Sequence, residues 1–177
     1  IVCDGYGVHA DYTLVAAQGF RFLWAAHALL DVSPAARLVA TEGTPTRVDI
    51  PAGESAAAPY LTGPWPAPNG HRLDRLGPDD GSAIGAVLTG CRSAVVVDGT
   101  DRLILRVYAD PGVPVSMALW RNLGGFPEAA QYRSIGVEPI LGAVFDLADA
   151  ADAATVPTNG ELEWRLELSA ARTEEFP

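Results

Sequence analysis

The stretch that decides the fold is SAVVVDGTDRLILRVYA, residues 93–109. Its two halves, Ser93–Val97 and Arg102–Ala109, are rich in Val, Ile and Leu, which favour β-strands. Asp98-Gly99 lies between them, and an Asp-Gly pair between two apolar runs is typical of a hairpin turn. The stretch therefore predicts two antiparallel strands joined by a tight turn.

Strand-like segments continue in both directions along the chain. The last one, Glu161–Ala170, alternates apolar and charged residues, which puts Leu162, Trp164, Leu166 and Leu168 on one face. The remaining predicted strands are Tyr12–Ala17, Phe20–Val32, Arg37–Thr41, Arg47–Ile50, Ser82–Leu88, Val115–Asn122 and Tyr132–Ile140. We therefore predict a mainly β domain whose sheets pack face to face.

Two segments interrupt the succession of strands. Prolines are frequent from Glu54 to Gly70, and we predict an irregular loop there because proline cannot donate a hydrogen bond to a sheet ladder. Val144–Ala153 has apolar residues spaced along one side, which predicts a helix. Gln18-Gly19 is expected to form a turn.

Composition and charge exclude several classes of function. The 177 residues suit one domain, and a net charge of −10 disfavours binding to nucleic acid or to an anionic membrane surface. All 12 basic residues are Arg, so the chain has neither a Schiff-base lysine nor a P-loop lysine. No apolar run approaches the roughly 20 residues needed to cross a bilayer. With few cysteines and no visible signal sequence, a cytoplasmic location is expected.

Cofactor and disulfide chemistry find little support in the sequence. Cys3 and Cys91 are the only cysteines, lie far apart and form no CxxC pair. A disulfide is the alternative to two unpaired thiols, and we favour the thiols. No cluster of His, Asp and Glu has the spacing of metal ligands, so we expect no metal and no other cofactor.

Two titratable residues lie in apolar surroundings. His27 is inside FLWAAHALL, residues 22–30, and the local sequence favours a core histidine hydrogen-bonded to a backbone carbonyl. Glu138 is inside IGVEPI, residues 135–140. It is either a general acid or base with a raised pKa, or a solvent-facing residue at a sheet edge. The remaining histidines, His9 and His71, are expected on solvent-exposed loops without a role.

The segment WRNLGGFP, residues 120–127, combines an aromatic ring, amide donors and a flexible Gly-Gly turn. An aromatic ring stacks on the C–H face of a sugar, and planar polar side chains bind its hydroxyl groups. The segment thus indicates sugar contacts by Trp120 and Asn122. The alternative is an apolar strand that simply ends in a loop.

Taken in order, these segments resemble the aldose 1-epimerase (galactose mutarotase-like) family. FLWAAHALL is similar to the family's "flWaaHpll" segment. WRNLGGFP followed by YRSIGVEP, residues 132–139, is similar to "lW.n.gG…Y…glEP". LEWRL, residues 162–166, looks like the closing "eW.l.l" strand. The resemblance extends from about Tyr12 to Ala170.

The resemblance implies a β-supersandwich fold with a sugar-binding cleft on a sheet face. It also implies an isomerase that interconverts the α and β anomers of a sugar by acid/base ring opening, without a cofactor. By this resemblance Glu138 matches the general base and His27 the general acid. The expected substrate contacts are Trp24, Trp120, Asn122 and Tyr132. The expected partner is a small-molecule sugar or sugar derivative, and no oligomeric state is indicated.

Family members are longer than this chain. The part that precedes their "WaaH" segment carries a substrate-binding Arg and another active-site His, and it is mostly absent here. The chain also begins at Ile1, and its only methionine is Met117. We therefore expect residues 1–177 to be the C-terminal portion of one longer galactose mutarotase-like β-sandwich domain, incomplete on its N-terminal side.

Two other functions stay open at this point. A non-catalytic carbohydrate-binding β-sandwich domain would keep Trp120 and Tyr132 exposed but hold His27 and Glu138 too far apart to act on one ring. An isomerase predicts instead that these two residues face each other across one cleft. A glycosidase needs two carboxylates beside the scissile bond, and because only Glu138 is suitable we rank it last.

Overall fold

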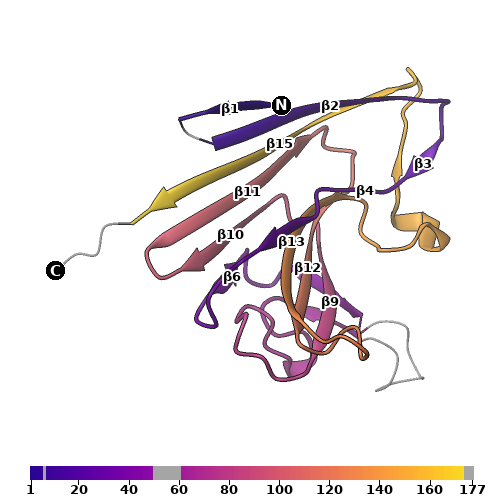
Figure 1. Ribbon diagram of the computed structural model, residues 1–177. Helices are drawn as coiled ribbons and strands as arrows, with labels where there is room; N and C mark the ends of the chain where they lie inside the picture. Colours follow the sequence, from indigo (N-terminus) through magenta and orange to yellow (C-terminus); the bar gives the residue numbers. More distant parts are fainter. Residues whose placement is uncertain (6, 50–60, 174–177) are drawn as a thin grey trace.

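The computed structural model describes residues 1–5, 7–49 and 61–173, and these residues lie mostly in antiparallel β-sheets (Figure 1). The six-stranded sheet contains, in spatial order, β1 (Val2–Asp4), β2 (Gly7–Val15), β15 (Glu161–Arg172), β11 (Asp101–Ala109), β10 (Ser93–Asp98) and β6 (Arg37–Val39). The seven-stranded sheet contains β4 (Trp24–Ala25), β13 (Arg133–Leu141), β12 (Val115–Leu123), β9 (Ala83–Thr89), β7 (Pro45–Asp49) and β8 (Leu61–Pro64), with β5 (Ala28–Leu30) also paired to β13. The third sheet pairs β3 (Arg21–Phe22) with β14 (Ala154–Thr155). The mainly β prediction is confirmed.

The predicted hairpin is present at β10 and β11. Asp98 pairs with Asp101, and Gly99 adopts a φ of +56° in the turn between them. This left-handed conformation is one that glycine adopts at low cost. The strands extend one residue further toward the turn than the sequence indicated.

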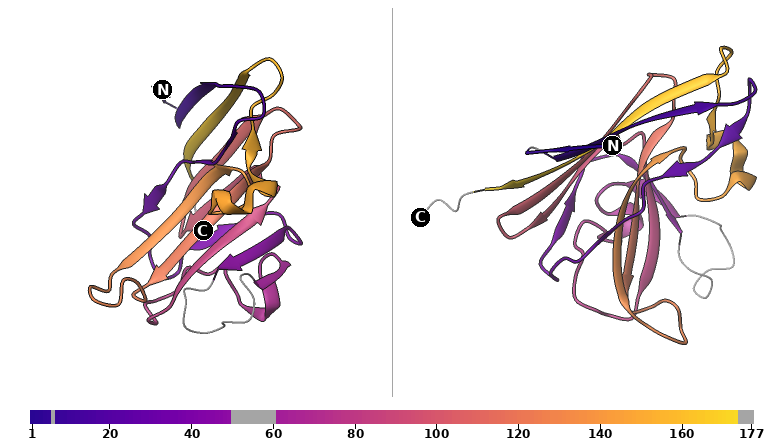
Figure 2. Two further views of the ribbon diagram at one scale, coloured as in Figure 1. Left: turned by 90° about the vertical axis from the view of Figure 1, so that its right-hand side faces the viewer. Right: turned by 45° about the horizontal axis from the view of Figure 1, so that its top comes forward.

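The two large sheets form separate layers that pack through one main core (Figure 2). Alternate residues of each strand point inward, as the period of two requires. The core includes Val96 and Leu105 from the six-stranded sheet and Leu88, Leu119 and Val137 from the seven-stranded sheet, each 3% exposed or less. On β15, the predicted apolar face is observed, with Leu162, Trp164 and Leu166 buried and Leu168 partly buried.

A second, aromatic core lies at one end of the sandwich. The ring of Tyr12 stacks on that of Trp164 with centroids 5.3 Å apart, and Trp24 meets Trp164 edge-on at 5.4 Å. Leu168 packs against both the main core and the aromatic core. This shared contact joins the two cores into one continuous interior.

The single strand expected over Phe20–Val32 is observed as three short strands, β3, β4 and β5. β3 pairs with β14, whereas β4 and β5 follow the edge of β13. The break between β4 and β5 lies opposite Pro139. Because Pro139 has no N–H to donate, the ladder cannot continue there.

Two other expectations need correction. The helix expected over Val144–Ala153 is a short 3-10 turn, η2 (Leu147–Asp152). The N–H of Ala143 donates to the carbonyl of Asp152 at 2.9 Å, which closes this connection into a compact loop. Within the loop expected from Glu54 to Gly70, residues 54–60 lie outside the described part. The rest contains β8 and a 3-10 turn, η1 (Pro68–Gly70). β8 is an edge strand, a position that tolerates proline.

The cysteines and histidines outside the site give mixed results. Cys3 is an exposed thiol and Cys91 a buried one, which confirms the prediction of two unpaired cysteines. His71 is exposed between regular elements, as expected, but His9 lies within β2 opposite Glu167. The loop prediction for His9 is therefore wrong. In the part of the chain that the structure describes, no helix has the length and apolar character required to span a bilayer.

Candidate active site

The two titratable residues in apolar segments of the sequence, His27 and Glu138, lie on the outward face of the seven-stranded sheet. Along β13, Ile135 and Val137 point into the main core, so the alternate residues Gly136 and Glu138 point away from it. The register pairs Trp120 of β12 with Gly136. Trp120 therefore lies on the same face as Glu138.

His27 reaches this face because the chain turns tightly around it. The N–H of Ala26 donates to the carbonyl of Pro139 at 3.0 Å, and the N–H of Ala28 donates to the carbonyl of Ala26 at 3.0 Å. The second bond spans only His27, which makes it the central residue of a γ-turn. The turn leaves the His27 side chain 56% exposed, so the buried core histidine favoured by its local sequence is not observed.

His27 and Glu138 contact each other directly. Nε2 of His27 lies 3.1 Å from Oε1 of Glu138. The Glu138 side chain is only 10% exposed, in contrast to the open imidazole. A ligand approaching this face would thus meet the imidazole first and the carboxylate behind it.

Burial raises the pKa of the Glu138 carboxyl above its ordinary value, and the charge of His27 opposes that rise. Glu138 is paired in register with Ala118, which belongs to a small buried cluster with Val87 and Ile140. These apolar neighbours lie on the same outward face. A carboxylate in such surroundings is a stronger proton acceptor than one in water, and this property suits a general base.

Gly136 keeps the space beside the pair open. A Cβ atom at this position would lie 2.8 Å from Oε1 of Glu138, 3.2 Å from Cβ of Trp120 and 3.5 Å from Cε1 of His27. No ordinary side chain fits at the first of these distances without displacing the carboxylate. Gly136 therefore leaves one point of the sheet surface without a side chain, and Glu138, Trp120 and His27 surround that point.

Trp120 is held in a fixed orientation next to Gly136. Its Nε1 donates to Oγ of Ser134 at 2.9 Å, and its ring meets Phe126 edge-on with centroids 5.9 Å apart. The side chain remains half-buried, so part of the ring surface is accessible. A fixed aromatic surface beside a polar pair is what stacking on a sugar ring requires.

Asn122 supports this arrangement from beneath the surface. Its residue exposure is 0%, and its Nδ2 donates to the carbonyl of Phe126 at 2.7 Å. Its Oδ1 accepts from the N–H groups of Gly125 at 2.9 Å and Phe126 at 3.0 Å. Asn122 thus holds the loop that places Phe126 against Trp120, and its amide is not presented to a ligand at the surface.

Trp24 and Tyr132 lie away from the pair. Trp24 pairs with Leu141, whose side chain is in the aromatic core, and packs with Tyr12 at a centroid distance of 4.9 Å. It therefore faces the interior. Tyr132 is 55% exposed and precedes Glu138 by six residues, about 20 Å along an extended strand. The structure brings together His27, Glu138 and Trp120 from the predicted set.

Sequence reasoning missed Gly136, Ser134 and Phe126 as parts of the site. The alternation of β13 was the available signal, because it places Ser134, Gly136 and Glu138 on one face. The contact of Phe126 with Trp120 depends on a loop conformation that no sequence periodicity describes.

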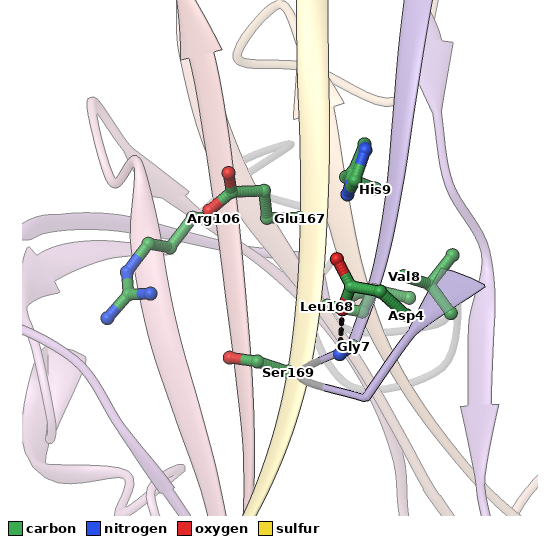
Figure 3. Close-up of a pocket in the computed structure, with 8 residues that line it drawn as sticks. All are labelled: Asp4, Gly7, Val8, His9, Arg106, Glu167, Leu168 and Ser169. Atoms are coloured by element: carbon green, nitrogen blue, oxygen red, sulfur yellow. Dashed lines mark hydrogen bonds between the residues drawn. The ribbon is translucent and has the colours of Figure 1, made fainter. Parts of the chain in front are cut away.

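A separate hollow of about 300 Å³ lies on the six-stranded sheet (Figure 3). Its polar lining includes His9, Glu167 and Arg106, which are consecutive partners across β2, β15 and β11. None of these strands carries His27 or Glu138, so the hollow is distinct from the candidate site. Among the described residues, no group of three or more His, Cys, Asp and Glu side chains is arranged to hold a metal ion.

Comparison with solved structures identifies the fold. A protein assigned as an aldose 1-epimerase from Escherichia coli K12 matches with a TM-score of 0.60 at 12% identity, over 95% of this chain and 57% of that one. A galactose mutarotase-like protein from Lactobacillus casei ATCC 334 matches with a TM-score of 0.57 at 15% identity, over 96% and 60% of the two chains. A TPR-domain containing protein from Parabacteroides distasonis ATCC 8503 has a TM-score of 0.58 at 10% identity, over 95% and 28%.

The chain therefore has the β-sandwich fold of galactose mutarotase-like proteins and spans less than two thirds of the length of these neighbours. No protein-family model matches the sequence. No curated protein is detectably similar to it in sequence. The similarity is one of fold, and a fold alone does not define a function.

Proposed function

We propose that this chain is an aldose 1-epimerase-like isomerase that interconverts the α and β anomers of a sugar. The observation that carries the proposal is the contact between Nε2 of His27 and Oε1 of Glu138, 3.1 Å apart on an accessible sheet face. Anomer exchange needs an acid and a base at two oxygens bonded to the same carbon, C1. An acid and a base side by side match that requirement.

In the proposed reaction, the Glu138 carboxylate removes the proton of the anomeric hydroxyl group while the His27 imidazolium protonates the ring oxygen. The bond between C1 and the ring oxygen then breaks, which gives the open-chain aldehyde. Rotation about the C1–C2 bond presents the other face of the aldehyde. The ring closes with the two roles reversed, and both side chains regain their original protonation states. Positioned proton transfer of this kind typically contributes about 10²–10⁴-fold in rate.

The proposal requires the two side chains to be ionised together. The reaction begins with Glu138 as a carboxylate and His27 as an imidazolium, 3.1 Å apart. Because the reaction needs one group deprotonated and the other protonated, the pH–rate profile is expected to be bell-shaped. Because burial raises the pKa of Glu138, the acidic limit should lie above the ordinary value for a glutamate.

Exchange NMR on a panel of reducing sugars tests the proposal. The wild-type chain should accelerate exchange between the α and β signals of at least one sugar. Glu138→Gln and His27→Asn should each abolish the acceleration while leaving the fold intact. Glu163→Gln removes a carboxylate from the exposed face of β15 and should have no effect. Acceleration that persists in Glu138→Gln would refute the assigned base.

A second candidate function is carbohydrate binding without turnover. The exposed Tyr132 matches what this candidate requires, whereas the 3.1 Å contact between His27 and Glu138 contradicts the wide separation expected for it. The TPR-domain neighbour shows that this fold also occurs in proteins that are not described as epimerases. Sugar binding without faster anomer exchange, in a folded sample, would favour this candidate.

A further inference from the structure

One row of residues runs across five strands of the outward face of the seven-stranded sheet. Asp49 of β7 pairs with Gly85 of β9, Gly85 with Trp120, Trp120 with Gly136, and Gly136 with Leu29 of β5. We call these five residues the glycine row. Trp120 is its central member and has a glycine on each side, so the sheet surface is free of Cβ atoms immediately to both sides of the ring.

The two glycines mark two chemically different ends. At Gly136 the neighbours are the carboxylate of Glu138 and the imidazole of His27. At Gly85, a Cβ atom would meet Cε2 of the Phe145 ring at 3.5 Å and Cβ of Asp49 at 3.8 Å. The row thus has a proton-transfer end and an end formed by an aromatic ring and a carboxylate.

The spacing of the strands relates these ends to the size of a ligand. Gly136 and Gly85 are two strands apart, about 10 Å, and Asp49 is one strand further. A sugar whose anomeric carbon lies at Glu138 would extend over Trp120 and direct its far substituents toward Gly85. Phe145 is 47% exposed and Asp49 is exposed, so both are accessible to those substituents.

The charge at the far end is negative. Arg47 lies two residues before Asp49 on the same face of β7, and its guanidinium is paired with the carboxylate of Asp152. Among residues 1–5, 7–49 and 61–173, no ion pair involves Asp49, so its negative charge is not compensated there. A carboxylate in this setting accepts hydrogen bonds from hydroxyl groups and repels anionic substituents.

We propose that Asp49 and Phe145 form the specificity-determining end of the site and select a sugar whose end remote from C1 is uncharged and carries hydroxyl groups. This inference rests on the proposed function for the orientation of the sugar. Asp49 accepts a hydrogen bond from a remote hydroxyl group, and Phe145 covers the adjacent C–H surface. A phosphate or carboxylate at that end of the sugar is disfavoured by the charge of Asp49.

Paired sugars test this selection on the 177-residue chain at low salt. The probes are glucose and galactose, each with its 6-phosphate, and binding is measured by NMR titration. We expect each neutral sugar to bind at least about fivefold more tightly than its phosphate, the effect of about 1 kcal/mol of repulsion at short range. Asp49→Asn should reduce that ratio to near one. Glu163→Gln removes the same charge from the other sheet and should leave the ratio unchanged.

A second variant examines Phe145. Phe145→Ala should weaken binding of the neutral sugars several-fold, and Phe145→Leu should restore part of the loss. Equal binding of neutral and phosphorylated sugars by the wild type, no binding of any probe, or equal ratios in Asp49→Asn and the wild type would overturn the inference.

The experiment also separates this inference from the proposed function. Asp49-dependent binding without accelerated anomer exchange would contradict the isomerase and retain the selection at the far end. If exchange is accelerated but the affinity ratio of neutral to phosphorylated sugar is the same in the wild type and in Asp49→Asn, the isomerase proposal stands. The role of Asp49 in selecting the sugar is then contradicted.

Discussion

Pro139 lacks an N–H group, and the missing hydrogen-bond donor accounts for the turn that exposes His27. The sheet ladder fails opposite Pro139, the chain makes a γ-turn around His27, and the imidazole emerges beside Glu138. The apolar run around His27 indicated a buried histidine, because a sequence pattern does not contain the partner strand. Glu138 and Trp120 were recognisable by residue type, whereas Gly136 acquires its role only from the side chains that surround it.

The first residue-scale prediction concerns Gly136. In Gly136→Ala, the new Cβ would lie 2.8 Å from Oε1 of Glu138, so the carboxylate has to move away from His27. We expect loss of any anomer exchange activity, because the carboxylate that must shift is the proposed base, and only a small change in stability, because that carboxylate is the end of a side chain. Gly112→Ala is the control, since a Cβ atom there meets nothing within 4 Å. Exchange NMR on both variants measures the difference, and full activity in Gly136→Ala would contradict the geometry.

A second residue-scale prediction follows from the raised pKa of Glu138. A folded-state pKa above the unfolded value, ordinarily 4.5, means that the folded chain holds this proton more tightly. Stability from this residue is fully present below the unfolded pKa and is lost as the pH rises through the folded pKa. Glu138→Gln should therefore gain stability relative to the wild type between pH 4 and pH 7.

Denaturant unfolding at the two pH values measures this change, with Glu163→Gln as the exposed control. A wild type that gains stability over Glu138→Gln as the pH rises would show that the pairing with His27 outweighs the burial of Glu138.

At the scale of elements, alternation and turn residues predicted most of the long strands. The hairpin of β10 and β11 follows from two runs rich in Val, Ile and Leu around Asp98-Gly99, and β15 follows from its period of two. The separate strands within Phe20–Val32 could not be predicted, because the break between β4 and β5 depends on Pro139 in another strand, β13. The helix expected over Val144–Ala153 failed because its two ends are tied together by the bond between Ala143 and Asp152.

The loop between β12 and β13 gives the element-scale prediction. Asn122→Ala removes three hydrogen bonds at a position with 0% exposure and leaves the N–H groups of Gly125 and Phe126 without their acceptor. We expect a loss of about 2–4 kcal/mol in the free energy of unfolding. Asn159→Ala, at an exposed turn with one bond to Glu161, should cost less than about 1 kcal/mol. Similar losses in the two variants would contradict the supporting role of Asn122.

At the scale of the whole molecule, two cores share one interior. Leu168 contacts both, so the main core and the aromatic core should unfold together as a single domain. Leu105→Ala in the main core should cost about 2–5 kcal/mol. Hydrogen exchange at amides near Leu105 and near Trp164 should give the same maximum free energy of opening. In Leu105→Ala, both free energies should fall together. Loss of protection in the main core alone would show two independent units.

The site on this molecule depends on a sheet face whose layout is set by the whole fold. Roles for His27, Glu138 and Trp120 were predicted from the sequence, but only the register of three strands brings them around Gly136. Anomer exchange by NMR on a panel of reducing sugars, with the wild type and Glu138→Gln side by side, tests that arrangement most directly. The account predicts faster exchange for the wild type and none for Glu138→Gln. Folded wild type that accelerates exchange of no sugar would contradict it.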